Sequence, residues 1–257
     1  ASEHLLSFRS AAAGFYDLVS NGGTGNLGGF KSGCTSNLIA AGGVLNAPDY
    51  TRTCQCSYQN QTSLALIHMP ELEYWTTNEF KWNGKRVSRI GLNLNAPGDR
   101  VATDGTLWVD FPSVGGKSPD LPVSFDPAAV RAVRRHSLTL QPNGHEWVAA
   151  SGLAGPLKLK IALAGETSGA ASYTVKLHFA ELENRQPGER IFNVRLQDRE
   201  VLRAFDIAGA AGGADKPVVK TFSHIGVKDA LTVECLPVSP EKGPPPLLSG
   251  IEIILEN

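Results

Sequence analysis

The chain has 257 residues, of which 42% are hydrophobic and 19% are charged, so it can bury a sizeable core without help from metals. Its 24 Lys and Arg residues nearly balance 25 Asp and Glu residues, and there is no long basic run, which excludes the electrostatic footprint of a nucleic-acid or anionic-membrane binder. No apolar run approaches the roughly 18 residues of a transmembrane helix, and no signal peptide is recognisable. We therefore expect no nucleic-acid partner and no membrane span. Because the chain starts at Ala1 without methionine, we expect a mature or excised product.

Glycine and proline recur throughout the chain, with 27 and 16 copies, and short apolar or alternating runs lie between them. This rhythm predicts β-strands joined by turns. In the first third the expected strands are His4–Arg9, Gly14–Val19, Asn37–Ala41, Val44–Asn46 and Ser63–His68, with Gly22–Gly33 as an ordered loop. An acidic and aromatic connection follows. We predict a β unit over residues 1–75, a connection over 76–84 and a second domain over 85–257.

The second region alternates more regularly. The expected strands are Val87–Leu94, Thr106–Phe111, Leu157–Ala164, Tyr173–Phe179, Ile191–Leu196, Val201–Asp206, Val218–Phe222, Leu231–Leu236 and Leu248–Leu255. The Asn143-Gly144 pair predicts a hairpin between His136–Leu140 and Glu146–Ala150. Asp126–Arg135 is the one expected helix, with Asp126 as its cap. So many short strands predict an all-β sandwich.

The stretch YTVKLHFAELENRQPGERIFNVRLQDREVLRAFDI (173–207) and the terminal LSGIEI (248–253) resemble the malectin and malectin-like family. A strand ending in aromatic-Ala-Glu, a loop, a Val/Ile-Phe-Asp/Asn-Val strand and a Phe/Leu-Asp-Ile segment follow one another in the family's order. The resemblance covers about residues 85–257. It implies a jelly-roll β-sandwich that binds carbohydrate without hydrolysing it.

The N-terminal third carries a second resemblance. Ser2–Ser10, Gly29–Cys34 and Gly43–Gln61 resemble the closing blade of quinoprotein-like β-propellers from bacteria of the planctomycete type. The resemblance implies that an upstream propeller or enzyme domain precedes this chain in a longer protein, and that the N-terminal strands either pack on the sandwich or stay with that propeller.

The malectin resemblance places the sugar site in the loop after Ala180-Glu181, where the family has aromatic residues, and at an acidic residue before the last strand. This sequence has Glu183 and Asn184 at the aromatic positions, and Pro244 and Pro245 at the acidic one. The family's disaccharide site is therefore not reproduced. Glu181, which resembles a recurrent family residue, is expected to brace the loop or to contact sugar, and the carbohydrate-binding candidates in this loop are Glu181, Glu183, Asn184 and Arg190.

Sugar binding uses flat aromatic surfaces together with polar groups for the hydroxyls. The candidate platforms are Trp82, Trp108 and Trp147. In TLWVDF, Trp108 and Asp110 share the strand face opposite Val109, so we expect them to point outward, or Trp108 to fill an inter-domain contact. Trp147 has an alternative interpretation as a core residue. Asp99 and Asp104 are candidates for binding hydroxyls or calcium, against a role as turn formers.

No motif for catalysis stands out, and the six histidines are dispersed, with His178 expected at the surface. We therefore predict a non-catalytic module that binds poly- or oligosaccharide. One alternative is a polysaccharide-active hydrolase or lyase that uses loop carboxylates. Another is a structural domain that docks a propeller or a cell-surface partner. No cofactor is expected, apart from the open calcium option.

Two of the four cysteines form the pattern Cys54-x-Cys56, which is a weak match to a zinc site. A disulfide from Cys34 to Cys54 would close a loop of roughly twenty residues and stabilise the fold by about 3 kcal/mol. Pairing of Cys34 with Cys56 is the alternative. Either disulfide predicts a secreted or periplasmic protein. Cys235, in an apolar strand, is expected to be a buried thiol or a tie to the N-terminal strands.

Overall fold

A computed structural model describes residues 1–10, 12–30, 37–48, 63–67, 73–77, 80–113, 121–165, 169–239 and 243–256. These parts of the chain consist mainly of strands, with only short helical segments between them. The all-β class predicted from the sequence is confirmed. No helix in the described ranges is long and apolar enough to cross a membrane.

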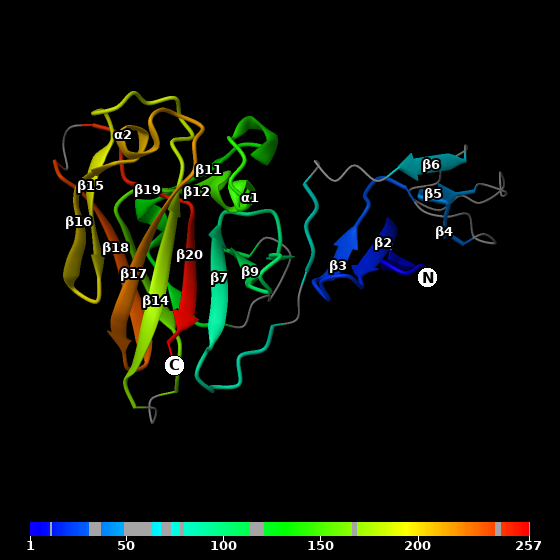
Figure 1. Ribbon diagram of the computed structural model, residues 1–257, viewed down its shortest axis with the longest axis horizontal. Coiled ribbons are helices and arrows are strands. Elements are labelled where there is room, and N and C mark those ends of the chain that lie inside the picture. The colour runs from blue at the N-terminus through cyan, green and yellow to red at the C-terminus, as the bar shows by residue number, and fades with distance from the viewer. Residues whose placement is uncertain are drawn as a thin grey trace.

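Two large sheets form a β-sandwich (Figure 1). The first has the order β17–β14–β20–β7–β9–β8, with bounds Val218–Val227, Ala171–Phe179, Gly250–Leu255, Arg89–Leu94, Leu107–Phe111 and Arg100–Val101. The second has the order β10–β13–β18–β15–β16, with bounds Val123–Ser124, Leu157–Ala162, Ala230–Pro237, Ile191–Leu196 and Arg199–Asp206. Neighbouring strands are antiparallel, except for β7 and β9, which run parallel.

The sandwich core follows the two-residue period that the sequence predicts. In β13, Leu157, Leu159 and Ile161 are buried while Lys158 and Lys160 are exposed. The apolar residues of β14, β18 and β20 join the same core cluster. Each fully buried side chain of this size contributes about 1.5–3 kcal/mol. Cys235 of β18 is a buried free thiol in this core, which confirms one of its two interpretations.

A small sheet and four short helical segments complete the sandwich. The small sheet has the order β11–β12–β19, with bounds Arg131–Arg134, Ser151–Ala154 and Leu247–Leu248. The helical segments are the 3-10 turns η1 (Pro127–Ala129) and η2 (Ser137–Thr139) and the α-helices α1 (Glu146–Ala149) and α2 (Ile207–Ala211).

The N-terminal strands form two separate three-stranded antiparallel sheets, which Figure 1 shows to one side of the sandwich. One consists of β1 (Leu5–Ser10), β2 (Ala12–Asp17) and β3 (Gly23–Asn26), and the other of β4 (Ile39–Ala41), β5 (Val44–Ala47) and β6 (Leu64–Ile67). They connect to the sandwich through residues 73–77, where Thr77 bridges to Thr24 and Thr76 bridges to Asp99. Part of the expected loop Gly22–Gly33 is therefore strand β3.

The expected hairpin at Asn143-Gly144 is wrong. Side-chain hydrogen bonds within the turn explain the difference: the Asn143 side chain accepts one from His145 N at 2.9 Å, and Glu146 accepts one from Asn143 N at 3.1 Å. These bonds start helix α1 where a second strand was expected. Residues 137–139 form a 3-10 turn instead of the first strand.

The expected helix over Asp126–Arg135 is also wrong beyond its first turn. Asp126 does cap the segment, because its side chain accepts a hydrogen bond from Ala128 N at 3.0 Å. The chain then turns extended at Val130 and forms β11, which pairs with β12 over four residues. Tertiary pairing thus overrides a weak local helix propensity.

Glycines on two neighbouring strands make room for one large ring. A Cβ added at Gly91 in β7 would collide with the six-membered ring of Trp108, and one at Gly250 in β20 would lie 3.1 Å from Trp108 Cζ3. The indole of Trp108 therefore lies across these two positions of the outer sheet surface. Gly91 is thus required for packing.

We expect Gly91→Ala to lower the free energy of unfolding by about 1–3 kcal/mol, because the added methyl displaces a ring that cannot move. The measurement is urea denaturation followed by circular dichroism. Gly226→Ala in β17 is the matched control, since nothing lies within 4 Å of its added Cβ. Equal effects of the two substitutions would contradict the packing argument.

Candidate functional site

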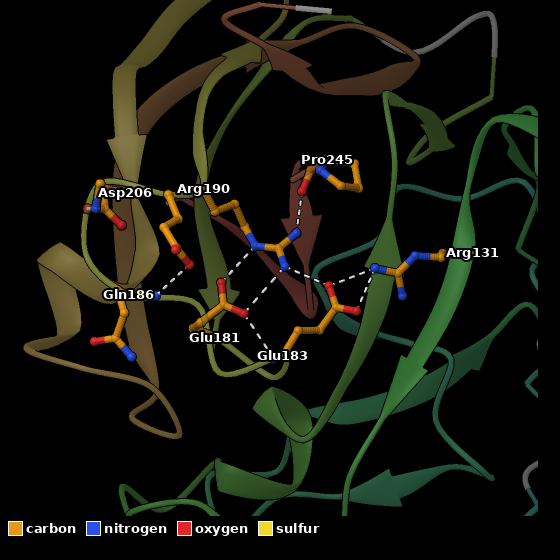
Figure 2. A network of polar contacts seen from close by, with 9 residues as sticks. Arg131, Glu181, Glu183, Gln186, Arg190, Asp206 and Pro245 are labelled. Atoms are coloured by element: carbon orange, nitrogen blue, oxygen red, sulfur yellow. Dashed lines mark hydrogen bonds and ion pairs between the residues drawn. The ribbon is translucent and has the colours of Figure 1, made fainter. Parts of the chain in front are cut away.

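The loop after β14 is organised around a buried ion pair. Glu181 and Arg190 are both completely buried, at the start and the end of this loop. Arg190 Nε donates to Glu181 Oε2 at 2.7 Å, and Arg190 Nη2 lies 3.3 Å from Glu181 Oε1 (Figure 2). The second Arg190 amino group donates to the carbonyl oxygen of Pro245. One guanidinium therefore joins both ends of the loop to the segment that leads into β19.

Glu183 extends this network to the surface. Its carboxylate accepts a hydrogen bond from Arg190 Nη2 at 2.6 Å and two from Arg131 Nη2 at 2.5 and 2.7 Å. Burial opposes ionisation of Glu183, but the hydrogen bonds from Arg131 and Arg190 outweigh it and hold the pKa of this carboxyl below its ordinary value. The side chain of Arg131 is 52% exposed and that of Glu183 is 21% exposed. The network thus presents one fixed carboxylate and one guanidinium to solvent.

The outer part of the loop is held by its own backbone. Asn184 is exposed and adopts a left-handed conformation with φ 57°, which asparagine tolerates better than most residues. Gln186 N donates to Glu189 Oε2 at 2.9 Å, and Gly188 N donates to Asp206 Oδ2 at 2.6 Å (Figure 2). We call Arg131, Glu183, Asn184 and the buried pair beneath them the loop site.

The loop site suits binding better than acid catalysis. Glycoside hydrolysis needs one carboxyl that stays protonated at working pH. Glu183 is held ionised by two arginines, and Glu181 is paired with Arg190 in a buried position. A carboxylate beside a guanidinium can instead accept and donate hydrogen bonds to hydroxyl or amide groups of a ligand.

The predicted outward platform at Trp108 is wrong, because its side chain is 0% exposed. Trp108 does point away from the sandwich core, but α1 covers that surface and brings Trp147 to a ring distance of 5.9 Å. The interpretation of Trp147 as a core residue is confirmed. His178, expected at the surface, is also buried here, because it shares this covered face.

The remaining tryptophan candidate is a turn anchor. Trp82 is partly buried against the sandwich core, and its Nε1 donates to the carbonyl oxygen of Lys85 at 2.8 Å. It lies outside the loop site and outside the buried cluster of Trp108, Trp147 and Val148.

The aspartate candidates have structural partners. Asp99 is buried and accepts a hydrogen bond from Asp110 N at 2.9 Å, so it joins β9 to the loop before β8. Asp110 is buried as well, which contradicts its predicted outward position. Asp104 is a turn former: it accepts from Thr106 N at 3.0 Å and pairs with Arg89 at 2.5 Å. Within the described ranges no three His, Cys, Asp or Glu side chains gather as a metal site.

The predicted disulfide lies outside the described residues, since Cys34, Cys54 and Cys56 fall in ranges that the structure does not describe. No sequence pattern singled out Arg131 or its contact with Glu183. These two residues are 52 positions apart. No local pattern connects them, and only the pairing of β11 with β12 sets the position of Arg131.

Residues 161–237 match the family model described as the Malectin domain. This range runs from the end of β13 to the end of β18 and contains Glu181, Glu183 and Arg190. A probable LRR receptor-like serine/threonine-protein kinase from Arabidopsis thaliana is 39% identical over 70 residues, which make up 25% of this chain and 7% of that protein.

Two solved structures share the fold. The ANXUR1 extracellular domain from Arabidopsis thaliana has a TM-score of 0.51 at 14% identity, over 76% of this chain and 57% of that one. Bacteroides uniformis β-glucuronidase has a TM-score of 0.51 at 12% identity, over 100% of this chain and 28% of that one. Such identities establish similarity of fold alone.

The observed fold, the family-model match and the similar solved structures together define an all-β protein with a malectin-like β-sandwich. The malectin part of the predicted resemblance is thereby confirmed for residues 161–237. The chain covers less than two thirds of each of these relatives. The resemblance of the N-terminal third to a propeller blade stays a prediction.

Proposed function

We propose that this chain is a non-catalytic carbohydrate-binding module whose ligand contacts the loop site through polar side chains. The observation that carries the proposal is the buried Arg190–Glu181 pair, which fixes Glu183 and Arg131 in one arrangement before any ligand arrives. Preorganised groups lose little conformational entropy on binding. The malectin match includes the loop that bears Glu181, Glu183 and Asn184, the position at which the family resemblance implies a sugar site.

The proposed mode of binding differs from aromatic stacking. Trp108 and Trp147 are buried, so they leave no pyranose-sized apolar surface on their strand face. Glu183 accepts hydrogen bonds from sugar hydroxyls, and Arg131 and Asn184 donate them. Such a site is polar and tolerates water-bridged contacts.

We propose the same domain organisation that the sequence suggests. Residues 1–75 would form a small β unit with propeller-blade ancestry, 76–84 a connection and 85–257 the sandwich, with an upstream propeller or enzyme domain in the full protein. A secreted or periplasmic location is part of the proposal. It is supported by the similarity of the fold to a domain described as extracellular.

Arg131→Ala is expected to weaken binding of the cognate polysaccharide at least tenfold, because it removes one donor to the ligand and one of the two arginines that hold Glu183. The fold should survive, since an exposed ion pair contributes about 0–1 kcal/mol. The measurement is a glycan array followed by affinity electrophoresis on glucans, xylans and mannans. Glu183→Gln should have a similar effect.

Lys158→Ala is the matched control, because Lys158 of β13 is an exposed cation that pairs with Glu234 of the neighbouring strand β18, away from the loop site. It should bind like the unmodified chain. Binding that is equal in all three variants, or absent for every glucan, xylan and mannan, would contradict the proposal. Release of reducing ends from the same polysaccharides would favour the alternative of a glycoside hydrolase or lyase. Capture of a propeller or cell-surface protein without glycan binding would favour the docking alternative.

A further inference from the structure

A cluster of four rings lies on the sheet surface opposite the sandwich core, outside the loop site. It consists of Trp108 from β9, His178 from β14, and His145 and Trp147 from the start of α1. The ring centroids of Trp108 and His178 are 5.0 Å apart, and those of His145 and His178 are 5.7 Å apart. We call these residues the ring cluster. Helix α1 covers the rings of Trp108 and His178.

Four polar atoms of the ring cluster are buried without a hydrogen-bond partner in the described protein. They are Trp108 Nε1, His145 Nε2 and both nitrogens of His178. Buried polar atoms are nearly always hydrogen-bonded, so these four atoms are exceptions. Ring packing holds α1 on the sheet, together with hydrogen bonds from Asn93 Nδ2 to the Trp147 carbonyl at 3.5 Å and from Ser249 Oγ to the Ala149 carbonyl at 3.3 Å. Opening this cluster costs less free energy than opening one in which these atoms are bonded, because water can bond to them once the cluster is open.

No acceptor is available for a second proton on His178. The carboxylate that acts on His178, Glu252 of β20, is already bonded to Arg89 at 2.8 Å, to Lys176 at 2.9 Å and to Thr106 at 2.9 Å. Burial, and then the neighbouring His145, lower the pKa of His178 to about 3, although Glu252 acts in the opposite direction. A charged His178 is therefore incompatible with the closed cluster.

The other charged groups around the cluster are occupied. Asp104 pairs with Arg89, and Glu146 accepts a hydrogen bond from Asn143 N in the turn before α1. Arg100 of β8 stacks on Trp147 with its guanidinium carbon 4.7 Å from the ring centroid. The titratable and charged groups on the elements that pack against the two histidines are thus Arg89, Arg100, Asp99, Asp104, Asp110, Glu146, Lys176 and Glu252.

Helix α1 also touches the segment that leads to the N-terminal strands. The ring of Trp75 lies 6.1 Å from that of Trp147, edge to face. Tyr74 stacks on Arg100 from the other side, at 4.6 Å. Glu73 accepts a hydrogen bond from Ser137 N at 2.5 Å, just before the loop to α1. Movement of α1 would therefore disturb residues 73–77 as well.

We infer that residues 141–149 form an acid-sensitive latch, which closes over neutral His178 and opens when His178 takes up a proton. In the open form α1 leaves the sheet surface, His178 reaches water, and Trp147 no longer holds Trp75 and Arg100. The two large sheets and the loop site stay folded, while the latch gives up the packing of Ala149 against the sandwich core and the hydrogen bond from Gln141 N to Asp215 O.

The direction of the pH dependence follows from proton linkage. A histidine in water has a pKa near 6.5, and the closed latch lowers that of His178 to about 3. The open form therefore binds the proton more tightly, and its population grows as the pH falls below about 6.5. Between about pH 6 and pH 3 the increase approaches tenfold per pH unit for one such group.

Hydrogen–deuterium exchange with mass spectrometry tests the latch at pH 7, 6, 5 and 4, after correction for the intrinsic pH dependence of amide exchange. The opening equilibrium of peptides over residues 141–150 should increase by about tenfold from pH 5 to pH 4. The opening equilibrium of peptides that cover β13 should stay constant over the same pH range. His178→Gln should abolish the pH dependence, and His4→Gln, which changes an exposed histidine, should leave it intact.

Three outcomes would overturn the inference. The first is exchange at residues 141–150 that does not depend on pH after correction. The second is an equal rise in the β13 peptides, which would mean global unfolding. The third, which needs no variant, is an NMR titration of the unmodified chain in which the His178 Cε1 proton titrates near pH 6.5 while the protein stays native.

Discussion

Arg190→Met is expected to lower the free energy of unfolding by about 3–5 kcal/mol, the largest effect of any single substitution in the loop site. The change leaves Glu181 as a completely buried carboxylate without its cation. It also removes the donor to the Pro245 carbonyl and one of two arginines on Glu183. Urea denaturation measures this loss of stability. The slope of the unfolding free energy against urea concentration should be unchanged if the folded and unfolded states keep their compactness.

A double variant separates two free energies: the cost of leaving a buried charge without its partner, and the net contribution of the ion pair to stability. Arg190→Met combined with Glu181→Leu should be more stable than Arg190→Met alone, because a buried ion pair replaced by apolar groups is often nearly neutral. Arg131→Ala should cost no more than about 1 kcal/mol, since this arginine is half exposed. A loss below about 1 kcal/mol for Arg190→Met would refute the central role of the buried pair.

Trp108→Ala is expected to lower the free energy of unfolding by about 3–5 kcal/mol, as for other large-to-small changes in a core. Its indole contacts Trp147 and His178 and lies over Gly91 and Gly250. The measurement is thermal and urea unfolding of the variant. At temperatures where it remains folded, its affinity for the polysaccharide should be unchanged, because Trp108 is completely buried and outside the loop site.

Tyr74→Ala is the comparison for the loss of an aromatic ring at the surface, since Tyr74 is 40% exposed. Its cost should stay within about 0.5–1 kcal/mol, which reflects mainly the stacking on Arg100. If Trp108→Ala were as mild as Tyr74→Ala and weakened sugar binding, Trp108 would be the exposed platform that the alternating pattern first suggested.

The strand patterns predicted most of the sandwich because alternation records local geometry. The run LKLKIALA alternates, and β13 buries Leu157, Leu159 and Ile161 while exposing the lysines between them. The same reasoning placed Trp108 and Val109 on opposite faces of β9, which is correct. It assumed that the second face meets solvent, and α1 covers it instead. A two-residue period assigns residues to faces but does not reveal what covers each face.

The two wrong predictions, a hairpin at Asn143-Gly144 and a helix over Asp126–Arg135, have a related cause. Asn143-Gly144 fits a hairpin, and Asp126-Pro127 fits a helix start, and both are real turn signals. Side-chain hydrogen bonds of Asn143 and Glu146 within the turn decide the first case, and pairing of β11 with β12 decides the second. Short segments have small intrinsic preferences, so a few tertiary hydrogen bonds outweigh them.

By itself the sequence determined the all-β class, most strands of the two large sheets, the malectin-like order of motifs and the loop that carries Glu181, Glu183, Asn184 and Arg190. Only the tertiary structure decided that Arg131 reaches Glu183, that Arg190 binds the Pro245 carbonyl, and that α1 buries Trp108 and His178. The physical reason is distance along the chain. Local period and turn chemistry act over a few residues, whereas these contacts join positions 52 and 55 residues apart, or depend on which segment covers an exposed sheet face.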